Sequence, residues 1–170
     1  TYNFAYAEPN TRYYFRLRAV NPNGITAYSN TVSFITRPVA PSNISFDNIT
    51  SSSFRVSWDA SPDASKYRVL VTRSDETGTT TVFSEYVYSG LSQVVDLLET
   101  GLKYHVRVYS YNEFGVRSFS NQEHEVVLKI DPPTNLTASF IDAYKFSFNW
   151  SPASGAIGYE LEVAKDDNFS

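Results

Sequence analysis

The sequence repeats itself with a period of about 90 residues, and this repeat constrains the fold more than any other feature. Residues 13–21 (YYFRLRAVN) match residues 104–112 (YHVRVYSYN), 91 positions further along the chain. A glycine turn and a matching tail follow each copy, GITAYSN at residues 24–30 and GVRSFSN at residues 115–121. A repeat of this period indicates that the chain is built from copies of one structural unit.

A second, independent match has an offset of 92 residues. Residues 41–45 (PSNIS) pair with residues 133–137 (PTNLT), and residues 54–58 (FRVSW) pair with residues 146–150 (FSFNW). A Tyr that opens an alternating apolar run follows nine residues after each Trp. Blocks that agree in both order and spacing do not arise by chance, so the second match supports the first.

The two matches divide the chain into three parts. We expect residues 1–37 to be the C-terminal half of one unit, residues 38–129 to be a complete unit, and residues 130–170 to be the N-terminal half of a third. Prolines mark both boundaries, and proline ends strands because it cannot donate a hydrogen bond to a neighbouring strand. The chain is therefore expected to be an internal segment of a longer tandem array.

Apolar and polar residues alternate along most of the chain, which is the period of a β-strand with one buried face. The content of 13 Tyr and 12 Phe also favours strands. The side chains expected to point inward in the complete unit are Phe54, Val56, Trp58, Tyr67, Val69, Val71, Tyr104, Val106 and Val108. Several short strands within about 90 residues predict two packed antiparallel sheets.

These motifs resemble the fibronectin type III domain. Pro41, Trp58 and Tyr67 stand where this family has its opening proline, second-strand tryptophan and third-strand tyrosine, and residues 98–104 (LETGLKY) resemble its tyrosine corner. The resemblance covers essentially the whole chain. It implies an all-β fold of tandem immunoglobulin-like sandwiches, each with a three-stranded sheet packed on a four-stranded one. The structural core is then expected to include Trp58, Tyr67, Tyr104, Tyr13, Trp150 and Tyr159.

Composition argues against several functional classes. The net charge of −4 is unsuited to a nucleic-acid groove, and the lack of cysteine removes thiolate nucleophiles, disulfides and thiolate metal ligands. Neither His105 nor His124 has an acidic residue at a spacing that suggests a catalytic pair. We therefore expect no enzyme activity, no cofactor, no metal, no nucleic-acid partner and no membrane insertion within this segment.

Four residues are candidates for partner contact. Phe114 is an apolar residue at an expected loop tip, where it either meets a partner or packs on the adjacent unit. Arg107 and Tyr109 are expected on the outward face of a strand. Arg117 itself is expected at the end of the loop that carries Phe114. Aromatic rings beside cations can stack on sugar rings or on a protein partner, or they can simply cover their own sheet.

The sequence therefore predicts a non-enzymatic, extracellular or cell-surface spacer that also serves as an adhesion or protein-interaction scaffold of a larger protein. The expected partners are neighbouring repeats and a cell-surface protein or glycan. Short linkers without glycine should hold the units end to end with limited swing. The repeats of this chain are rich in Tyr and lack Cys, and in this they resemble bacterial repeat arrays. This resemblance favours a bacterial-type protein. The alternatives are an accessory module of a secreted polysaccharide-degrading enzyme and a component of a filament or phage tail.

Overall fold

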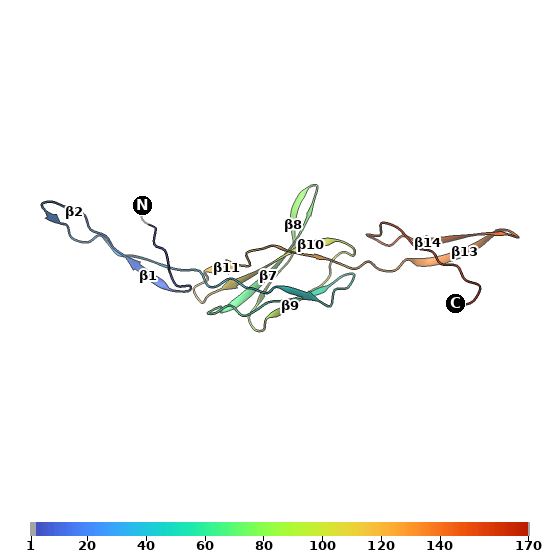
Figure 1. Ribbon diagram of the computed structural model, residues 1–170, viewed down its shortest axis with the longest axis horizontal. Helices are drawn as coiled ribbons and strands as arrows, with labels where there is room; N and C mark the ends of the chain where they lie inside the picture. Colours follow the sequence, from blue (N-terminus) through green and yellow to red (C-terminus); the bar gives the residue numbers. More distant parts are fainter. Residues whose placement is uncertain (1–2, 170) are drawn as a thin grey trace.

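A computed structural model describes residues 3–169, which form fourteen β-strands arranged in three consecutive parts (Figure 1). We call these parts the N-terminal segment (residues 3–37), the central sandwich (residues 38–129) and the C-terminal segment (residues 130–169). The outermost residues of the expected flanking units, 1–2 and 170, lie outside the described residues. Within the described range, the chain contains no helix that could cross a membrane.

The central sandwich consists of two antiparallel sheets. The smaller sheet has the order β5-β6-β9, and the larger has the order β11-β10-β7-β8, with β12 also paired to β10. The strands of the smaller sheet are β5 (Ser45–Asp47), β6 (Phe54–Ser57) and β9 (Ser92–Val95). The strands of the larger sheet are β7 (Lys66–Asp75), β8 (Gly78–Val87), β10 (Lys103–Tyr111), β11 (Arg117–Phe119) and β12 (His124–Val127).

The last strand of the larger sheet is interrupted. β11 pairs with the C-terminal part of β10, whereas β12 pairs with its N-terminal part, and residues 120–123 separate the two. Together they occupy the position of one edge strand, so the sandwich has three strands facing four, as the family resemblance implies. The fold class predicted from the sequence is confirmed.

The core lies between the two sheets and is built from alternate residues of β6, β7 and β10. All nine side chains that were expected to point inward are buried, with exposed fractions of at most 7%. Val87, Val95, Leu98, Val126 and Leu128 complete the cluster. Each fully buried aliphatic or aromatic side chain contributes about 1.5–3 kcal/mol to folding, so this cluster is the main source of stability in the chain.

Among the described residues, each flanking segment contains only two-stranded sheets. The N-terminal segment has β1 (Arg12–Phe15) paired with β4 (Val32–Ile35), and β2 (Val20–Asn21) paired with β3 (Gly24–Ile25). The C-terminal segment has β13 (Thr134–Asp142) paired with β14 (Lys145–Ser151).

One alternating run forms no strand. Residues 159–163, the apolar run that follows Trp150, have no regular secondary structure. In the central sandwich the run equivalent to residues 159–163 lies in β7, where β8 and β10 flank it on both sides. No described strand lies beside residues 159–163, so their backbone has no ladder to join.

Tyrosine hydroxyl groups tie strands to nearby loops in the same way in different units. The Tyr104 hydroxyl accepts a hydrogen bond from the Glu99 backbone N–H (2.9 Å) and donates one to the Glu99 carbonyl (3.1 Å). The equivalent Tyr13 hydroxyl accepts from the Glu8 backbone N–H at 2.8 Å. The tyrosine corner therefore forms even in the incomplete N-terminal segment.

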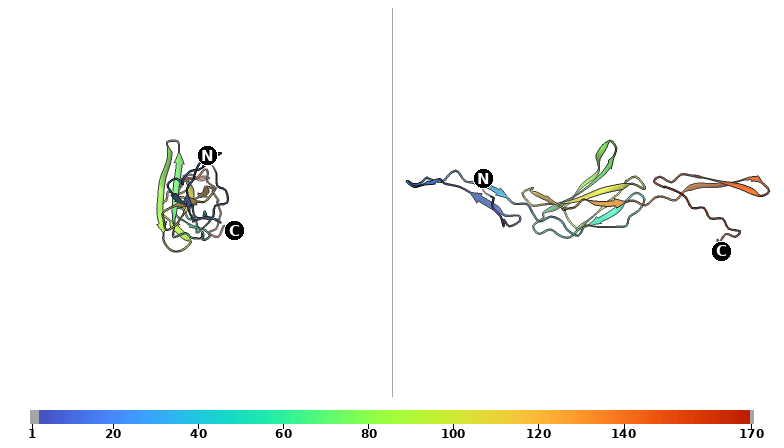
Figure 2. Two further views of the ribbon diagram at one scale, coloured as in Figure 1. Left: turned by 90° about the vertical axis from the view of Figure 1, so that its left-hand side faces the viewer. Right: turned by 45° about the horizontal axis from the view of Figure 1, so that its top comes forward.

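The three parts lie in a row along one axis (Figure 1). Seen end-on, they largely overlap, and the hairpin of β7 and β8 is the feature that projects from the row (Figure 2). The three parts therefore meet only at their ends, and contacts between them are confined to two joints.

Candidate functional site

The N-terminal joint is held by side chains. The Asn112 side chain, which is 1% exposed, donates a hydrogen bond from Nδ2 to Asn10 Oδ1 at 2.8 Å. The Arg12 guanidinium carbon lies 5.3 Å from the centre of the Phe114 ring, within the range of a cation–π contact. The turn that precedes β1 thus docks on the loop between β10 and β11.

The C-terminal joint is held by closely packed backbone. Gly101 precedes β10, and Gly155 lies in the loop after β14. A Cβ added to Gly101 would lie 2.9 Å from Gly155 Cα and 2.9 Å from Cγ2 of Ile130 in the linker. Because real Cβ atoms do not approach other atoms so closely, glycine is required at this contact.

The two joints use the same position of the repeating unit. Asn10 and Gly101 are 91 residues apart, and each stands in the turn that precedes the tyrosine-corner strand. Both have positive φ, 51° for Asn10 and 69° for Gly101, a conformation that Asn and Gly adopt most readily. One turn of each unit therefore contacts the following part of the chain.

The outer face of the larger sheet carries a second cluster, of cations and aromatic rings. In one row Tyr111 has Arg117 and Lys66 as its cross-strand neighbours. In the next row Tyr109 lies between Phe119 and Arg68, its neighbours on the adjacent strands. Tyr86 is the neighbour of Arg68 on the strand beyond. The Arg117 guanidinium lies 5.2 Å from the Tyr109 ring, and Lys66 Nζ lies 4.7 Å from the Tyr86 ring.

The ionisable side chains of this cluster shift the pKa values of their immediate neighbours. Burial would raise the pKa of the Tyr111 phenol, but hydrogen bonds from Arg117, Tyr86 and Arg68 outweigh burial and lower that pKa. The hydrogen bond between Arg117 and Tyr111, together with the negative charge of the ionised Tyr111, raises the pKa of Arg117. The cations therefore serve first to bind and cover the rings beneath them.

The family model of the fibronectin type III domain matches residues 39–126. The chain belongs to this family. Fibronectin type III modules are typical of adhesion and other cell-surface proteins, where they are typically extracellular and non-catalytic.

The chain is similar to curated proteins and to solved fibronectin type III structures. Protein sidekick-1 of Gallus gallus is 29% identical over 162 residues, which cover 85% of this chain but only 7% of the relative. A two-domain segment of chicken tenascin is 26% identical, with 71% of this chain and 65% of that chain covered and a TM-score of 0.49. The FN5 domain of Drosophila Lar is 22% identical, with 54% of this chain and 97% of that chain covered and a TM-score of 0.44.

Sidekick-1 is an animal protein, so the comparisons give no support to the expectation of a bacterial-type protein. That expectation rested on a general likeness in composition, which does not separate animal repeats from bacterial ones.

The four candidate contact residues occupy different environments. Phe114 is 53% exposed and meets Arg12 of the N-terminal segment. Arg117 is exposed at the sheet edge, and Arg107 is half-buried over Phe119, 3.7 Å from a Glu123 carboxylate oxygen. Tyr109 lies on the outward face as expected but is only 8% exposed, because neighbouring side chains cover it.

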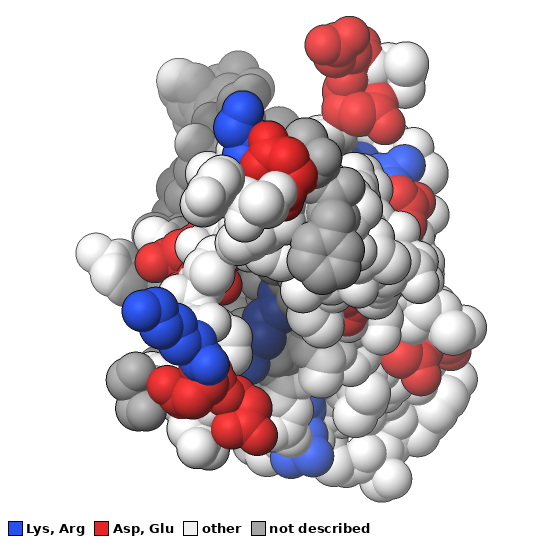
Figure 3. Space-filling model, turned by 90° about the vertical axis from the view of Figure 1, so that its right-hand side faces the viewer, with Lys and Arg blue, Asp and Glu red and all other residues white. Residues whose placement is uncertain are grey.

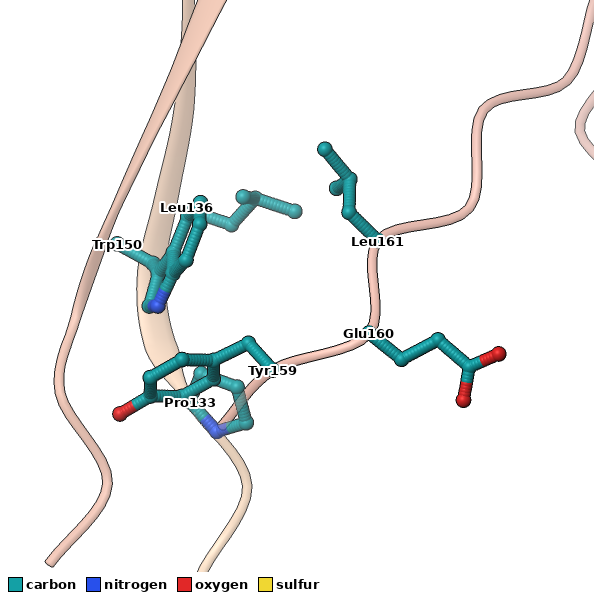
Figure 4. A pocket seen from close by; sticks show the side chains of 6 residues that line it. All are labelled: Pro133, Leu136, Trp150, Tyr159, Glu160 and Leu161. Carbon is teal, nitrogen blue, oxygen red and sulfur yellow. The ribbon is translucent and has the colours of Figure 1, made fainter. Parts of the chain in front are cut away.

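The six residues expected in the core also differ. Trp58, Tyr67 and Tyr104 are buried, whereas Tyr13 and Trp150 are half-buried and Tyr159 is 43% exposed. In the C-terminal segment, Trp150 and Tyr159 line a hollow of about 120 Å³ with Pro133, Leu136, Glu160 and Leu161 (Figure 4). The equivalent space in the central sandwich is filled, so this hollow is an incompletely packed core and we assign no ligand to it.

His105 has acidic neighbours that its sequence spacing did not reveal. Its Nδ1 atom lies 3.6 Å from a carboxylate oxygen of Glu123, just before β12, and 3.8 Å from one of Glu125, within β12. Among the described residues, no group of three or more His, Asp or Glu side chains is arranged to hold a metal ion. At the C-terminal end, basic and acidic side chains are interspersed on the visible face (Figure 3).

Proposed function

We propose that this chain is a segment of a semi-rigid extracellular spacer, in which fibronectin type III units are stacked end to end within a larger surface or secreted protein. In this proposal, residues 1–37 and 130–170 belong to the units that flank residues 38–129. The spacer holds other parts of the protein apart and presents the faces of its sheets to partners.

The observation that carries the proposal is that each joint has specific contacts in addition to the covalent linker. A linker alone would leave the units free to swing, particularly if it contained glycine. At one joint side chains form a hydrogen bond and a cation–π contact, and at the other two glycines and Ile130 are tightly packed. Such contacts restrict the angle between successive units.

The adhesive part of the proposal concerns the outer face of the larger sheet. Arg117 and Arg107 are its candidate contact residues; Arg117 lies over the Tyr109 ring, and Arg107 lies over the Phe119 ring. A cell-surface protein or glycan is the proposed partner class, because exposed cations beside aromatic rings suit both. Phe114 is assigned to the N-terminal joint, where the Arg12 guanidinium lies over its ring.

The spacer proposal can be tested by measuring the angular freedom of the C-terminal joint. The chain contains no cysteine, so spin labels can be placed on cysteines introduced at Thr80 and Tyr144. We expect a narrow distance distribution in the parent chain. Gly155→Ala should broaden or shift it, because the new Cβ would lie 2.9 Å from Gly101 Cα.

Gly115→Ala is the matched control for this experiment. Gly115 also has positive φ (77°), but a Cβ there would meet nothing within 4 Å. This variant therefore introduces similar backbone strain without a clash at the joint and should leave the distribution narrow. A distribution in the parent chain as broad as that of a flexible tether would refute the semi-rigid spacer.

A further inference from the structure

The side-chain amide of Asn112 has two separate tasks. Its Oδ1 atom accepts hydrogen bonds from the backbone N–H groups of Phe114 (3.1 Å) and Val116 (2.8 Å), which shapes the loop between β10 and β11. Because oxygen must face these two donors, the amide orientation is fixed and Nδ2 points away from the loop. The Nδ2 group meets Asn10 Oδ1 across the joint.

The repeat supplies an internal comparison for this loop. Asn21 is the equivalent of Asn112, and its Oδ1 accepts from the Asn23 backbone N–H at 2.9 Å, as Asn112 does from Phe114. Shaping the loop is therefore a task that both asparagines perform. Donation across a joint is seen only for Asn112 among the described residues, and it is a distinct task.

We propose that Asn112 is the residue by which the central unit recognises the preceding unit. Its ligand is a side-chain oxygen, of an amide or a carboxylate, carried at the positive-φ position of the turn before the tyrosine-corner strand. Asn10 supplies this oxygen, and Asn is one of the few residues that both adopts this conformation readily and bears such an oxygen. The inference rests on the proposed spacer and names the group that fixes one of its joints.

Burial explains why this single bond is selective. Asn112 is 1% exposed, so an Nδ2 group without a partner would remain unsatisfied away from water. Glycine at the equivalent position, as at Gly101, offers no side-chain oxygen, and Gly101 instead packs on Gly155. A residue without a side-chain oxygen in this turn would therefore leave the buried Asn112 amide without its partner.

Aspartate substitutions separate the two tasks of Asn112. In Asn112→Asp, the carboxylate still accepts from Phe114 and Val116, and the Asn10 amide can turn to donate to it. In Asn10→Asp, the carboxylate accepts from Asn112 as the amide oxygen did. Each single variant thus keeps a donor and an acceptor across the joint. The double variant has two acceptors and no donor, and its like charges repel.

The readout is the distance distribution between spin labels on cysteines introduced at Thr31 and Thr80, measured on the full chain. We expect narrow distributions for the parent and both single variants, and a broad one for the double variant at pH 7. At about pH 4, near the ordinary carboxyl pKa, protonation restores a donor and the double variant should become narrow again. A role confined to loop structure would not give this reversal.

The double variant Asn10→Asp, Asn21→Asp is the control, because it adds the same charge and alters the equivalent loop but leaves Asn112 intact. It should stay narrow at both pH values. The inference is overturned if the Asn10→Asp, Asn112→Asp variant stays as narrow as the parent, or if either single variant is already as broad as the double. A broad parent distribution would instead reject the spacer proposal itself.

Discussion

Trp58 with Tyr67 and Trp150 with Tyr159 are the same pair in two units, and their surroundings differ. The ring centres are 5.4 Å apart in the first pair and 5.3 Å in the second. In both, the tyrosine hydroxyl accepts a hydrogen bond from the backbone N–H six residues earlier in the chain, at 2.7 and 2.8 Å. Yet Tyr67 is 7% exposed and Tyr159 is 43% exposed.

This difference separates what neighbouring residues determine from what the whole sandwich determines. Ring contacts and loop hydrogen bonds form between residues close in sequence, so they are present in both units. Burial depends on a second sheet, which the central sandwich has and the described part of the C-terminal segment lacks. Stability should therefore be concentrated in the central sandwich although the motifs are shared.

The largest expected effect is on the tryptophan pair. Trp58→Ala should destabilise the central sandwich by about 3–5 kcal/mol, the usual cost of removing a buried aromatic side chain. Trp150→Ala should cost about 1 kcal/mol or less, because its side chain is only half-buried. Hydrogen exchange of the backbone amides in β6 and in β14 would report each cost locally. Equal costs would contradict the comparison.

A smaller difference is expected at the two tyrosine corners. Tyr104→Phe removes two hydrogen bonds to the half-buried Glu99 backbone and should cost about 1–2 kcal/mol. Tyr13→Phe should cost about 0.5 kcal/mol, because water can replace the hydroxyl at the exposed Glu8 N–H. Urea unfolding of the central sandwich and amide exchange at β1 would measure the two effects, and a larger loss at Tyr13 would reverse the expected order.

The smallest effect concerns pH. Lys103 Nζ lies 2.9 Å from a Glu125 carboxylate oxygen, and this hydrogen bond and charge lower the pKa of Glu125. A lowered pKa stabilises the folded state above the ordinary carboxyl pKa, and this stabilisation is lost as the pH falls through the lowered value. Lys103→Gln should return the Glu125 pKa toward its ordinary value in an NMR titration and reduce the acid-dependent loss of stability.

The N-terminal segment supplies a control for the pH prediction. Arg12 is the equivalent of Lys103, but it lies over Phe114 across the joint. Arg12→Gln should therefore leave the titration of Glu125 unchanged. A change of equal size in both variants would show that the pKa responds to overall charge and not to the local pair.

The sequence was sufficient for the repeat, the fold and the inward-facing residues of the central sandwich, because period-two alternation reports directly which face is buried. It was also sufficient to identify the tyrosine corner, whose hydrogen bonds link residues five apart in the chain. These features depend on local patterns that each unit carries in full.

The joints could not be predicted in the same way, because their contacts depend on how separate parts of the chain are placed. Asn10 and Asn112 are 102 residues apart, and no periodicity links Gly101 to Gly155. A partial signal was present, since Asn10 and Gly101 share a repeat position and both tolerate positive φ. The burial of Tyr109 was missed because alternation identifies the outward face but not what covers it.

The different chemistry of the two joints has a mechanical consequence. The Asn10–Asn112 joint is held by a directional hydrogen bond, which weakens gradually as the angle between the units changes. Gly101 and Gly155 meet through backbone atoms packed against the Ile130 side chain, so their contact has little room to close and resists compression. An array of nearly identical units is thus unevenly compliant along its length, with its preferred bending points set by one residue in each turn.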